Sequence, residues 1–529
     1  MNDPTHNQVP GQGFETRASS ANMGDARTRA EKKQINLMRG WPATSLLPRD
    51  RIQRAAASAL SDPAVATPGL LYGSDMGFEP LRAALAGWLG RFYGGLVEAK
   101  GGRSVFDVGE EGIAISGGAS QSVACILQSY TDPGVTRAVW MVAPCYFLAC
   151  PIFADNGFAG RLRGVREDEE GVDLEALEAM LEAEEEVMKR ERESGKQGGE
   201  ETARETERRY KNPGPNRKIY RHVIYCVPSY SNPSGVTMSL ACREGLVRLA
   251  RRFDALVICD DVYDMLQWRV APPSTTSCPP DTTPDLNKAL LPRLLDLDIA
   301  HGPSPHDPRD KHFGHVVSNA SFSKLVGPGV RTGWTHSTPD FAHGLSQTGS
   351  TRSGGAPSQL TATLIASLLA SGGLDAHIQD LLRPAYARRH ALLTDAVRRC
   401  VEPLGARLQR ESLAGRGDVF GGYFVWVRLP SAGTRGEAWP SATAIAERCR
   451  RDENLMIGHG PLFEVHGDDR KEAPRFGRDI RLCFAWEDEE DLVEGVERLG
   501  RVVGKMLEEG PEIWKRDLGE DTADVDKMK

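Results

Sequence analysis

The sequence lacks any long apolar run. Across its 529 residues, no stretch approaches the roughly 18 consecutive apolar residues that a membrane-spanning helix needs. The opening residues, MNDPTHNQVPGQGFETRASS, also lack the charged start and apolar centre of a secretory signal. These absences predict a protein with no membrane partner and a cytoplasmic localisation.

Paired cysteines and an excess of positive charge are missing as well. The ten cysteines are scattered without a C-x-x-C pair, so the sequence indicates neither a zinc site nor a disulfide framework. The net charge is -8, whereas a nucleic-acid-binding surface is normally basic. The hydrophobic fraction of 40% is that of an ordinary globular protein. We therefore expect a reduced intracellular enzyme that binds neither a metal nor nucleic acid.

One stretch, SNASFSKLVGPGVRTGW at 318–334, carries a distinctive combination of groups. Loss of solvent or a nearby positive charge lowers the pKa of a lysine amine such as Lys324, which can then react with an aldehyde. Arg331 can supply that charge and bind a phosphate, and the hydroxyls of Ser321 and Ser323 flank the lysine. An aldehyde and a phosphate on one ligand describe pyridoxal phosphate (PLP). A surface lysine beside a flexible Gly-Pro turn is the alternative interpretation of this stretch alone.

Short apolar runs alternate with helical patterns from Gly112 onwards. GIAIS, AVWMVA, HVIYCVP and ALVICDD have the length and composition of buried strands. Strands separated by helices predict right-handed crossovers and a mainly parallel sheet with helices on both faces, which is an α/β fold. In such a sheet, ligands bind at the carboxyl ends of the strands.

Changes in composition divide the chain into four predicted parts. These are a disordered arm at 1–33, an N-terminal segment of a small domain at 34–70, a large cofactor-binding domain at 71–345 and a C-terminal α+β domain at 346–529. Two inserts interrupt the large domain. The highly charged one at about 183–216 predicts a solvated helix plus a linker, and the proline-rich one at about 271–311 predicts an irregular surface excursion.

Three further motifs follow predicted strands and suit the same cofactor. Asp260 ends the strand in CDDVYDML, and a carboxylate facing the pyridine nitrogen would keep that nitrogen protonated. Asn232, in the turn of PSYSNPSG, and Tyr263 would donate hydrogen bonds to the phenolic oxygen. The GGASQS turn places backbone N–H groups at a helix N-terminus, where a phosphate can bind.

Together these motifs resemble those of the PLP-dependent aminotransferases of fold type I, class I/II. The most similar branch contains the aminoadipate, kynurenine and aromatic aminotransferases, and the resemblance extends over about residues 35–506. The matching elements, in the family's order, are Gly118-Ala119-Ser120, Pro144-Cys145-Tyr146, Asn232-Pro233-Ser234-Gly235, Asp260-x-x-Tyr263, Ser321-x-Ser323-Lys324 and Arg331.

The resemblance implies a seven-stranded sheet, a smaller α+β domain and a homodimer with shared active sites. It implies that Tyr146 stacks on the cofactor and that Tyr72 reaches the phosphate of the partner subunit. It also implies that Arg481 binds the substrate α-carboxylate, with Gly40 and Asn232 close to the substrate. The expected cofactor-binding residues are Tyr72, Gly118, Ala119, Ser120, Tyr146, Asn232, Asp260, Tyr263, Ser321, Ser323, Lys324 and Arg331.

One position departs from the family pattern. Ala119 stands where family members usually carry a hydroxyl or amide residue. Binding of the phosphate there would depend on backbone N–H groups and on Ser120.

The implied activity is transfer of an amino group from an L-amino acid to a 2-oxo acid such as 2-oxoglutarate, with ping-pong kinetics. Lys324 would move the α-proton, and Asp260 and Tyr263 would support the chemistry at the cofactor. Trp41 and neighbouring tyrosines supply aromatic surface, which favours aromatic or 2-aminoadipate-like substrates. Arg39 is a candidate cation for an acidic side chain, although a solvent-facing arginine is the alternative.

Three other functions are weighed against transamination. Lyases, synthases and cyclases that resemble aminocyclopropane-carboxylate synthase use the same fold and residues. Some bacterial transcription factors carry this domain behind a basic winged helix, which the short polar arm at 1–33 cannot form. A degenerate scaffold is disfavoured because every central group is present.

Overall fold

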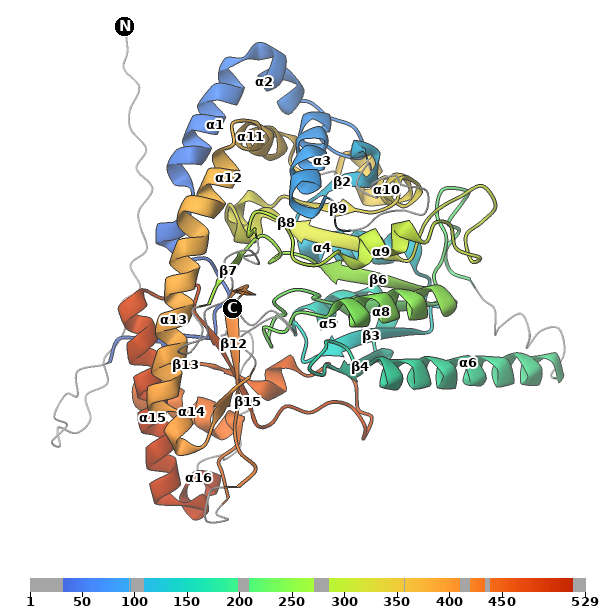
Figure 1. The fold of residues 1–529 in the computed structure, drawn as a ribbon. Helices are drawn as coiled ribbons and strands as arrows, with labels where there is room; N and C mark the ends of the chain where they lie inside the picture. Colours follow the sequence, from blue (N-terminus) through green and yellow to red (C-terminus); the bar gives the residue numbers. More distant parts are fainter. Residues whose placement is uncertain are drawn as a thin grey trace, which may run out of the picture. The chain divides into compact units, whose positions relative to one another are not determined.

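The computed structural model describes residues 32–94, 96, 109–197, 209–270, 285–355, 357–409, 419–432 and 438–516 (Figure 1). The chain divides into Met1–Lys33 and Gln34–Lys529, and every element given below belongs to the second unit. Most of the predicted arm at 1–33 and residues 271–284 of the second predicted insert lie outside the described residues. No helix in the described ranges is long and apolar enough to span a bilayer.

A seven-stranded sheet forms the centre of the larger part of the fold, with strand order β2-β9-β8-β6-β5-β3-β4. Only β9 is antiparallel to its neighbours, so β2, β8, β6, β5, β3 and β4 all point the same way. The strands are β2 (Ile113–Ser116), β3 (Ala138–Ala143), β4 (Leu162–Arg166), β5 (His222–Cys226), β6 (Ala255–Asp260), β8 (Val316–Ser321) and β9 (Gly333–His336). The sheet confirms the predicted α/β class.

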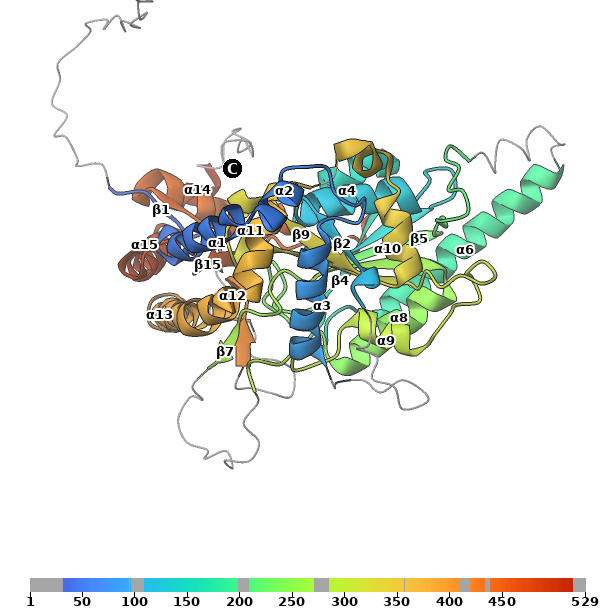
Figure 2. The same cartoon turned by 90° about the horizontal axis from the view of Figure 1, so that it is seen from above.

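Helices cover both faces of this sheet because its central strands carry apolar side chains on both faces. In β3, side chains alternate between two hydrophobic cores: Val139, Met141 and Ala143 enter one, and Ala138, Trp140 and Val142 enter the other. The first core is closed by α4 (Ala119–Tyr130), α5 (Ala149–Phe153) and α10 (Pro339–Ser346), and the second by α6 (Leu174–Gln197), α8 (Leu240–Arg252) and α9 (Leu294–Ala300). Figures 1 and 2 show α8 and α9 side by side.

A smaller antiparallel sheet, β10-β12-β15-β14, lies in the C-terminal part of the chain. Its strands are β10 (Arg407–Leu408), β12 (Phe424–Arg428), β14 (Gly458–His459) and β15 (Asp479–Cys483). The nearby helices are α13 (Arg383–Cys400), α14 (Ala442–Glu453), α15 (Glu489–Glu509) and α16 (Pro511–Arg516), and α13 packs along α15. The family fold's smaller α+β part is therefore present.

The N-terminal segment crosses to this smaller part. β1 (Ile35–Asn36) pairs in parallel with β13 (Leu455–Met456), so residues far apart in sequence are held together. A second two-stranded pairing joins β7 (Gln267–Arg269) to β11 (Val419–Gly421). The remaining helices are α1 (Arg49–Ser61), α2 (Pro63–Gly69), α3 (Glu79–Tyr93), α11 (Gln359–Ala370) and α12 (Gly373–His377), and both views show α1 beside α11.

Two helical segments differ from the sequence-based expectation. The second insert was predicted to be an irregular surface excursion, yet α9 lies within it and buries Leu294 and Leu295 against α8. The prediction was wrong there because the proline-rich start of the insert hid the short apolar repeat that follows. The charged, amphipathic sequence at about 374–401 also predicts one long helix, but a π-helical turn at Ile378–Leu382, two residues before Pro384, interrupts it. Proline has no N–H to donate and crowds the preceding turn, which explains the wider turn.

Candidate active site

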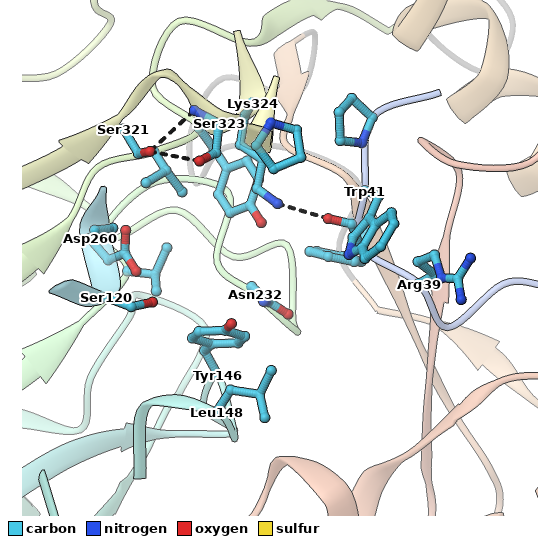
Figure 3. Close-up of a pocket in the computed structure, with 18 of the residues that line it drawn as sticks. Arg39, Trp41, Ser120, Tyr146, Leu148, Asn232, Asp260, Ser321, Ser323 and Lys324 are labelled. Atoms are coloured by element: carbon cyan, nitrogen blue, oxygen red, sulfur yellow. Dashed lines mark hydrogen bonds between the residues drawn. The ribbon is translucent and has the colours of Figure 1, made fainter. Parts of the chain in front are cut away.

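A pocket of about 410 Å³ lies where the carboxyl ends of β2, β3, β5, β6 and β8 face the N-terminal segment and β15. This size falls within the roughly 300–1,000 Å³ range of small-molecule sites. Figure 3 shows Lys324, Asp260, Tyr146 and Asn232 around the cavity. Its lining residues come from eight separate parts of the sequence: Met38–Pro42, Ala119–Ser120, Tyr146–Leu148, the 227–232 turn (Val227 and Asn232), the 260–263 turn, the 321–331 stretch, Phe424 and Arg481.

Lys324 ends a short helical turn, Phe322–Lys324, that directly follows β8. Its amine projects into the pocket and donates a hydrogen bond of 2.7 Å to the carbonyl oxygen of Gly40 (Figure 3). Exclusion of water lowers the pKa of this amine to about 8, and the positive charge of Arg481 acts in the same direction. Asp260 partly opposes this shift. The amine is therefore closer to its neutral, basic form near pH 7 than an ordinary lysine is.

Asp260 occupies the last position of β6, and only one of its two carboxylate oxygens accepts a hydrogen bond from a described residue. Its Oδ2 accepts a hydrogen bond of 2.8 Å from the hydroxyl of Tyr225. Its Oδ1 is buried and has no hydrogen-bond partner among the described residues. Burial raises the pKa of the carboxyl to about 6, while Tyr225 and Lys324 lower it. A buried acceptor left in this way calls for a donor on a ligand.

Arg481 projects from β15 and is only 4% exposed. Its Nη1 donates to Oδ1 of Asn232 at 2.7 Å, and its Nη2 donates to the carbonyl oxygen of Met38. Its Nε is buried without a partner, and no carboxylate among the described residues forms an ion pair with it. Burial lowers the pKa of this guanidinium to about 10. Such a cation needs an anion, which a substrate carboxylate would provide.

Hydroxyl, amide and guanidinium groups gather at one end of the pocket. The hydroxyls of Ser321 and Ser323 lie 2.9 Å apart, and Ser120 lies in the first turn of α4. Gly118 is the N-cap of that helix with φ of +106°, and an added Cβ would lie 3.0 Å from Nη2 of Arg331. Glycine is therefore needed for the backbone and the guanidinium to approach each other. No side chain in the described part of the chain caps the N–H groups of the first turn of α4, so an anion can bind them.

Twelve of the fourteen predicted site residues line this pocket: Gly40, Ala119, Ser120, Tyr146, Asn232, Asp260, Tyr263, Ser321, Ser323, Lys324, Arg331 and Arg481. Gly118 lies next to Ala119 at the start of α4. Tyr72 does not line the pocket, and its side chain is 90% exposed. Its expected place is the active site of a partner subunit, which a single chain does not contain.

Sequence reasoning missed three aromatic residues around the site. Tyr225 holds Asp260, Phe424 lies under the guanidinium of Arg481 at 4.1 Å, and Tyr423 contacts Lys324. A tyrosine inside the otherwise apolar run HVIYCVP was a detectable signal, since a buried hydroxyl needs a partner. Tyr423 and Phe424 look like ordinary strand residues, and nothing in the sequence distinguishes them.

The residues present fit PLP. The unpaired Oδ1 of Asp260 suits a pyridinium N–H, and the Nδ2 of Asn232 is left to donate because its Oδ1 already accepts from Arg481. The serines, Arg331 and the α4 N-terminus supply phosphate donors. A lysine amine with a lowered pKa faces the same cavity. Every polar part of the cofactor thus has a chemically matched group.

A family model for aminotransferase class I and II matches residues 33–499 of this chain. An uncharacterized protein of Saccharomyces cerevisiae is 32% identical to it over 89% of this chain and 97% of the yeast protein. This chain belongs to the class I and II aminotransferases. It is a PLP-dependent transaminase that acts on amino and 2-oxo acids.

Several further relatives of the aminotransferase have lower sequence identity to it. The 2-aminoadipate transaminase of Thermus thermophilus is 26% identical over 88% of this chain and 89% of its own. Among solved structures, the kynurenine aminotransferase of Pyrococcus horikoshii has a TM-score of 0.63 and 22% identity, with 91% of this chain and 95% of that chain covered. The α-aminoadipate aminotransferase LysN of Thermus thermophilus has a TM-score of 0.61 and 24% identity, with 90% and 93% covered. These structures confirm the predicted fold type I architecture.

Replacing Asp260 by asparagine tests the negative charge of the carboxylate. The amide keeps the shape and can still accept from Tyr225, but it cannot keep a pyridine nitrogen protonated. We expect kcat to fall by at least ~10²-fold with the fold preserved. Steady-state kinetics on the PLP-loaded protein measure this, and near-normal kcat would show that another group faces the nitrogen.

The same variant has a pH signature in the cofactor-free chain. Because the folded-state pKa of Asp260 is raised to about 6, the folded chain binds more protons than the unfolded chain between about pH 4 and 6. Wild type therefore loses stability relative to Asp260→Asn as pH rises through this window. Urea unfolding at pH 4.5 and 7.5 measures the change, and a pH-independent difference would contradict it.

Proposed function

We propose that this aminotransferase transfers the amino group of an L-amino acid with an aromatic or long side chain, such as 2-aminoadipate, to 2-oxoglutarate or a similar 2-oxo acid. The observation that carries this proposal is a buried Arg481, without a carboxylate partner in the described chain, in the same pocket as the amine of Lys324. A 2-amino acid bound by its α-carboxylate at Arg481 would present its α-carbon to that amine.

Lys324 is the proposed base that removes the proton from the substrate α-carbon and later returns a proton. Its lowered pKa makes the amine available near neutral pH. When bound, PLP supplies an electron sink for the charge that develops at the α-carbon. Asp260 would pair with the pyridine nitrogen, and Asn232 and Tyr263 would donate to the phenolic oxygen. Tyr146 would stack on the ring.

The phosphate would be held at the opposite end from Arg481 by a set of short side chains and backbone groups. The proposed phosphate ligands are the N–H groups of Ala119 and Ser120, the hydroxyls of Ser120, Ser321 and Ser323, and the guanidinium of Arg331. The N–H of Gly118 donates to Oγ of Ser116, so Gly118 would contribute by leaving room for the phosphate.

The wall available for the substrate side chain is largely apolar. Met38, Trp41, Phe147 and Leu148 line it. Figure 3 shows the guanidinium of Arg39 beyond Trp41, on the side away from Lys324. It is stacked 4.8 Å from the Trp41 ring and 5.1 Å from the Trp486 ring. This wall favours aromatic and long apolar side chains. An acidic side chain would form an ion pair with Arg39.

The names of two relatives support the same substrate class. The Thermus thermophilus relative is a 2-aminoadipate transaminase. The aromatic-amino-acid aminotransferase 1 of Thermococcus litoralis is 24% identical over 89% of this chain and 88% of its own. Both types of side chain are long, which agrees with an apolar wall.

We also propose a homodimer in which Tyr72 enters the active site of the partner subunit. Leu70, Leu71 and Tyr72 are 66%, 62% and 90% exposed, which is unusual for three consecutive large apolar residues. A second copy would cover them. We further propose the domain division at 34–70, 71–345 and 346–529, which the pairing of β1 with β13 supports for its first part.

Lys324→Ala should remove both cofactor attachment and turnover. Borohydride treatment followed by peptide mapping should find the cofactor on the Lys324 peptide of wild type and nowhere on the variant. Loss of the base should lower turnover by ~10²–10⁴-fold or more. Lys311→Ala is the matched control, since that lysine forms an ion pair with Asp340 away from the pocket. Unimpaired turnover in Lys324→Ala would refute the proposed role.

Arg39→Ala tests the substrate class. It should raise KM for 2-aminoadipate and glutamate by ~10-fold or more and leave KM for phenylalanine within about twofold. Arg39→Lys keeps the charge and should restore much of the affinity for acidic substrates. Equal effects on acidic and aromatic substrates would show that Arg39 only supports Trp41 and Trp486.

Solution scattering tests the proposed dimer, and Tyr72→Phe tests the proposed contact of Tyr72 with the cofactor of the partner subunit. Wild type should scatter as a dimer at working concentrations. Loss of the hydroxyl should weaken PLP binding by ~5–30-fold, the equivalent of one charged hydrogen bond of about 1–2 kcal/mol. A fully active monomer would contradict the shared site.

A further inference from the structure

We propose that Tyr423, braced by Tyr386, is a positioning residue that holds Lys324 in place for proton transfer. The inference rests on the proposed role of Lys324 as the base. It concerns two tyrosines that neither bind the substrate nor line the pocket.

A chain of hydrogen bonds joins the two tyrosines to the main chain of Lys324. The hydroxyl of Tyr423 donates to the carbonyl oxygen of Lys324 at 3.2 Å. The hydroxyls of Tyr386 and Tyr423 lie 3.0 Å apart. Each hydroxyl has a single proton, and that of Tyr423 is used on the carbonyl, so Tyr386 must be the donor to Tyr423. The direction of the chain is therefore Tyr386 to Tyr423 to Lys324.

The ring of Tyr423 also faces the amine of the same lysine. The Nζ of Lys324 lies 5.2 Å from the centre of the Tyr423 ring and 5.9 Å from that of Tyr263. An aromatic face attracts a protonated amine at this distance. Tyr423 therefore contacts both ends of Lys324, the backbone through its hydroxyl and the amine through its ring.

Neither tyrosine can move aside easily. Both are fully buried, at 0% exposure, and their rings lie 5.0 Å apart. Tyr386 belongs to α13, and Tyr423 lies between β11 and β12. Gly422, before Tyr423, has φ of +77°, and an added Cβ would lie 2.9 Å from the Cβ of Tyr230. The turn that orients Tyr423 thus depends on a glycine.

This turn also reaches the carboxylate-binding group. Phe424, the residue after Tyr423, lies 4.1 Å from the guanidinium of Arg481. Two consecutive residues therefore contact the proposed base and the proposed substrate anchor. A fixed separation of these groups keeps the substrate α-carbon within reach of the amine.

Single and double substitutions separate the two contacts of Tyr423. Tyr423→Phe removes the hydroxyl and keeps the ring, whereas Tyr423→Leu removes both. Tyr386→Phe removes only the hydrogen bond from Tyr386 to Tyr423. Tyr130→Phe is the matched control, because Tyr130 is also fully buried and donates to a backbone carbonyl, that of Phe341 at 2.5 Å, outside the pocket.

In the PLP-loaded enzyme, Tyr423→Phe should lower kcat by ~10-fold with KM within about twofold, since proton transfer is misaligned and carboxylate binding is intact. The isotope effect on kcat with an α-deuterated amino acid should rise, because proton transfer becomes more rate-limiting. Tyr386→Phe should give a smaller change of the same kind. The double variant should match Tyr423→Phe, because Tyr386 acts through Tyr423.

The cofactor-free chain provides a readout that does not depend on turnover. Labelling of Lys324 by an amine-reactive probe, followed across pH by mass spectrometry, reports the pKa of its amine. Tyr423→Leu should lower the midpoint, because the ring that favours the protonated amine is gone. Tyr423→Phe should leave it unchanged.

The inference is overturned if Tyr423→Phe matches Tyr130→Phe in kcat and isotope effect, or if Tyr423→Leu leaves the labelling midpoint in place. A fall in kcat with an unchanged isotope effect also overturns it, since that reports only fewer active molecules. If borohydride instead fixes no cofactor to Lys324 in wild type, the proposed function fails, and the labelling experiment still tests the contact with Tyr423.

Discussion

The active site depends on keeping three ionisable groups in one pocket with little water around them. Burial is the largest influence on each: it lowers the pKa of Lys324 and of Arg481 and raises that of Asp260. Placing such groups together without full pairing is energetically unfavourable. The unfavourable energy is reduced when a ligand brings a donor to Asp260 and a carboxylate to Arg481. The affinity for cofactor and substrate therefore comes in part from the polar groups of Asp260 and Arg481 that lack a partner in the described chain.

The parallel sheet makes this arrangement possible. Six strands point the same way, so the turns that follow five of them reach one edge and place short polar side chains there. The proposed phosphate donors come from the turns after β2 and β8, and the carboxylate of Asp260 comes from the end of β6. The two hydrophobic cores on either side keep these strand ends in register, because successive side chains of each strand are fixed in opposite layers.

The other half of the site comes from parts of the chain that do not belong to this sheet. Gly40 accepts the hydrogen bond of Lys324, and the N-terminal segment that carries it is anchored by the pairing of β1 with β13 and by the bond from Asn36 to Glu487. Arg481 and the Tyr423–Phe424 turn come from the smaller sheet. Any shift of that sheet relative to the large one would alter the distance between the lysine and the arginine. This is why the aromatic contacts across the pocket matter for chemistry as well as for packing.

The sequence by itself determined the class of fold and most of the residues around the pocket. Buried strands, glycine turns and the polar groups that follow them are local patterns, since a few neighbouring residues decide backbone conformation and which strand end a side chain follows. Lys324, Asp260 and Asn232 were identifiable for that reason. Only the tertiary structure decided which of these residues contact one another. Arg481 meets Asn232 across 249 residues and Tyr423 meets Lys324 across 99. Arg39, which lines the cavity, packs against Trp486. Contacts of this kind depend on how two sheets and a crossing N-terminal strand pack together, and no spacing along the chain records that geometry.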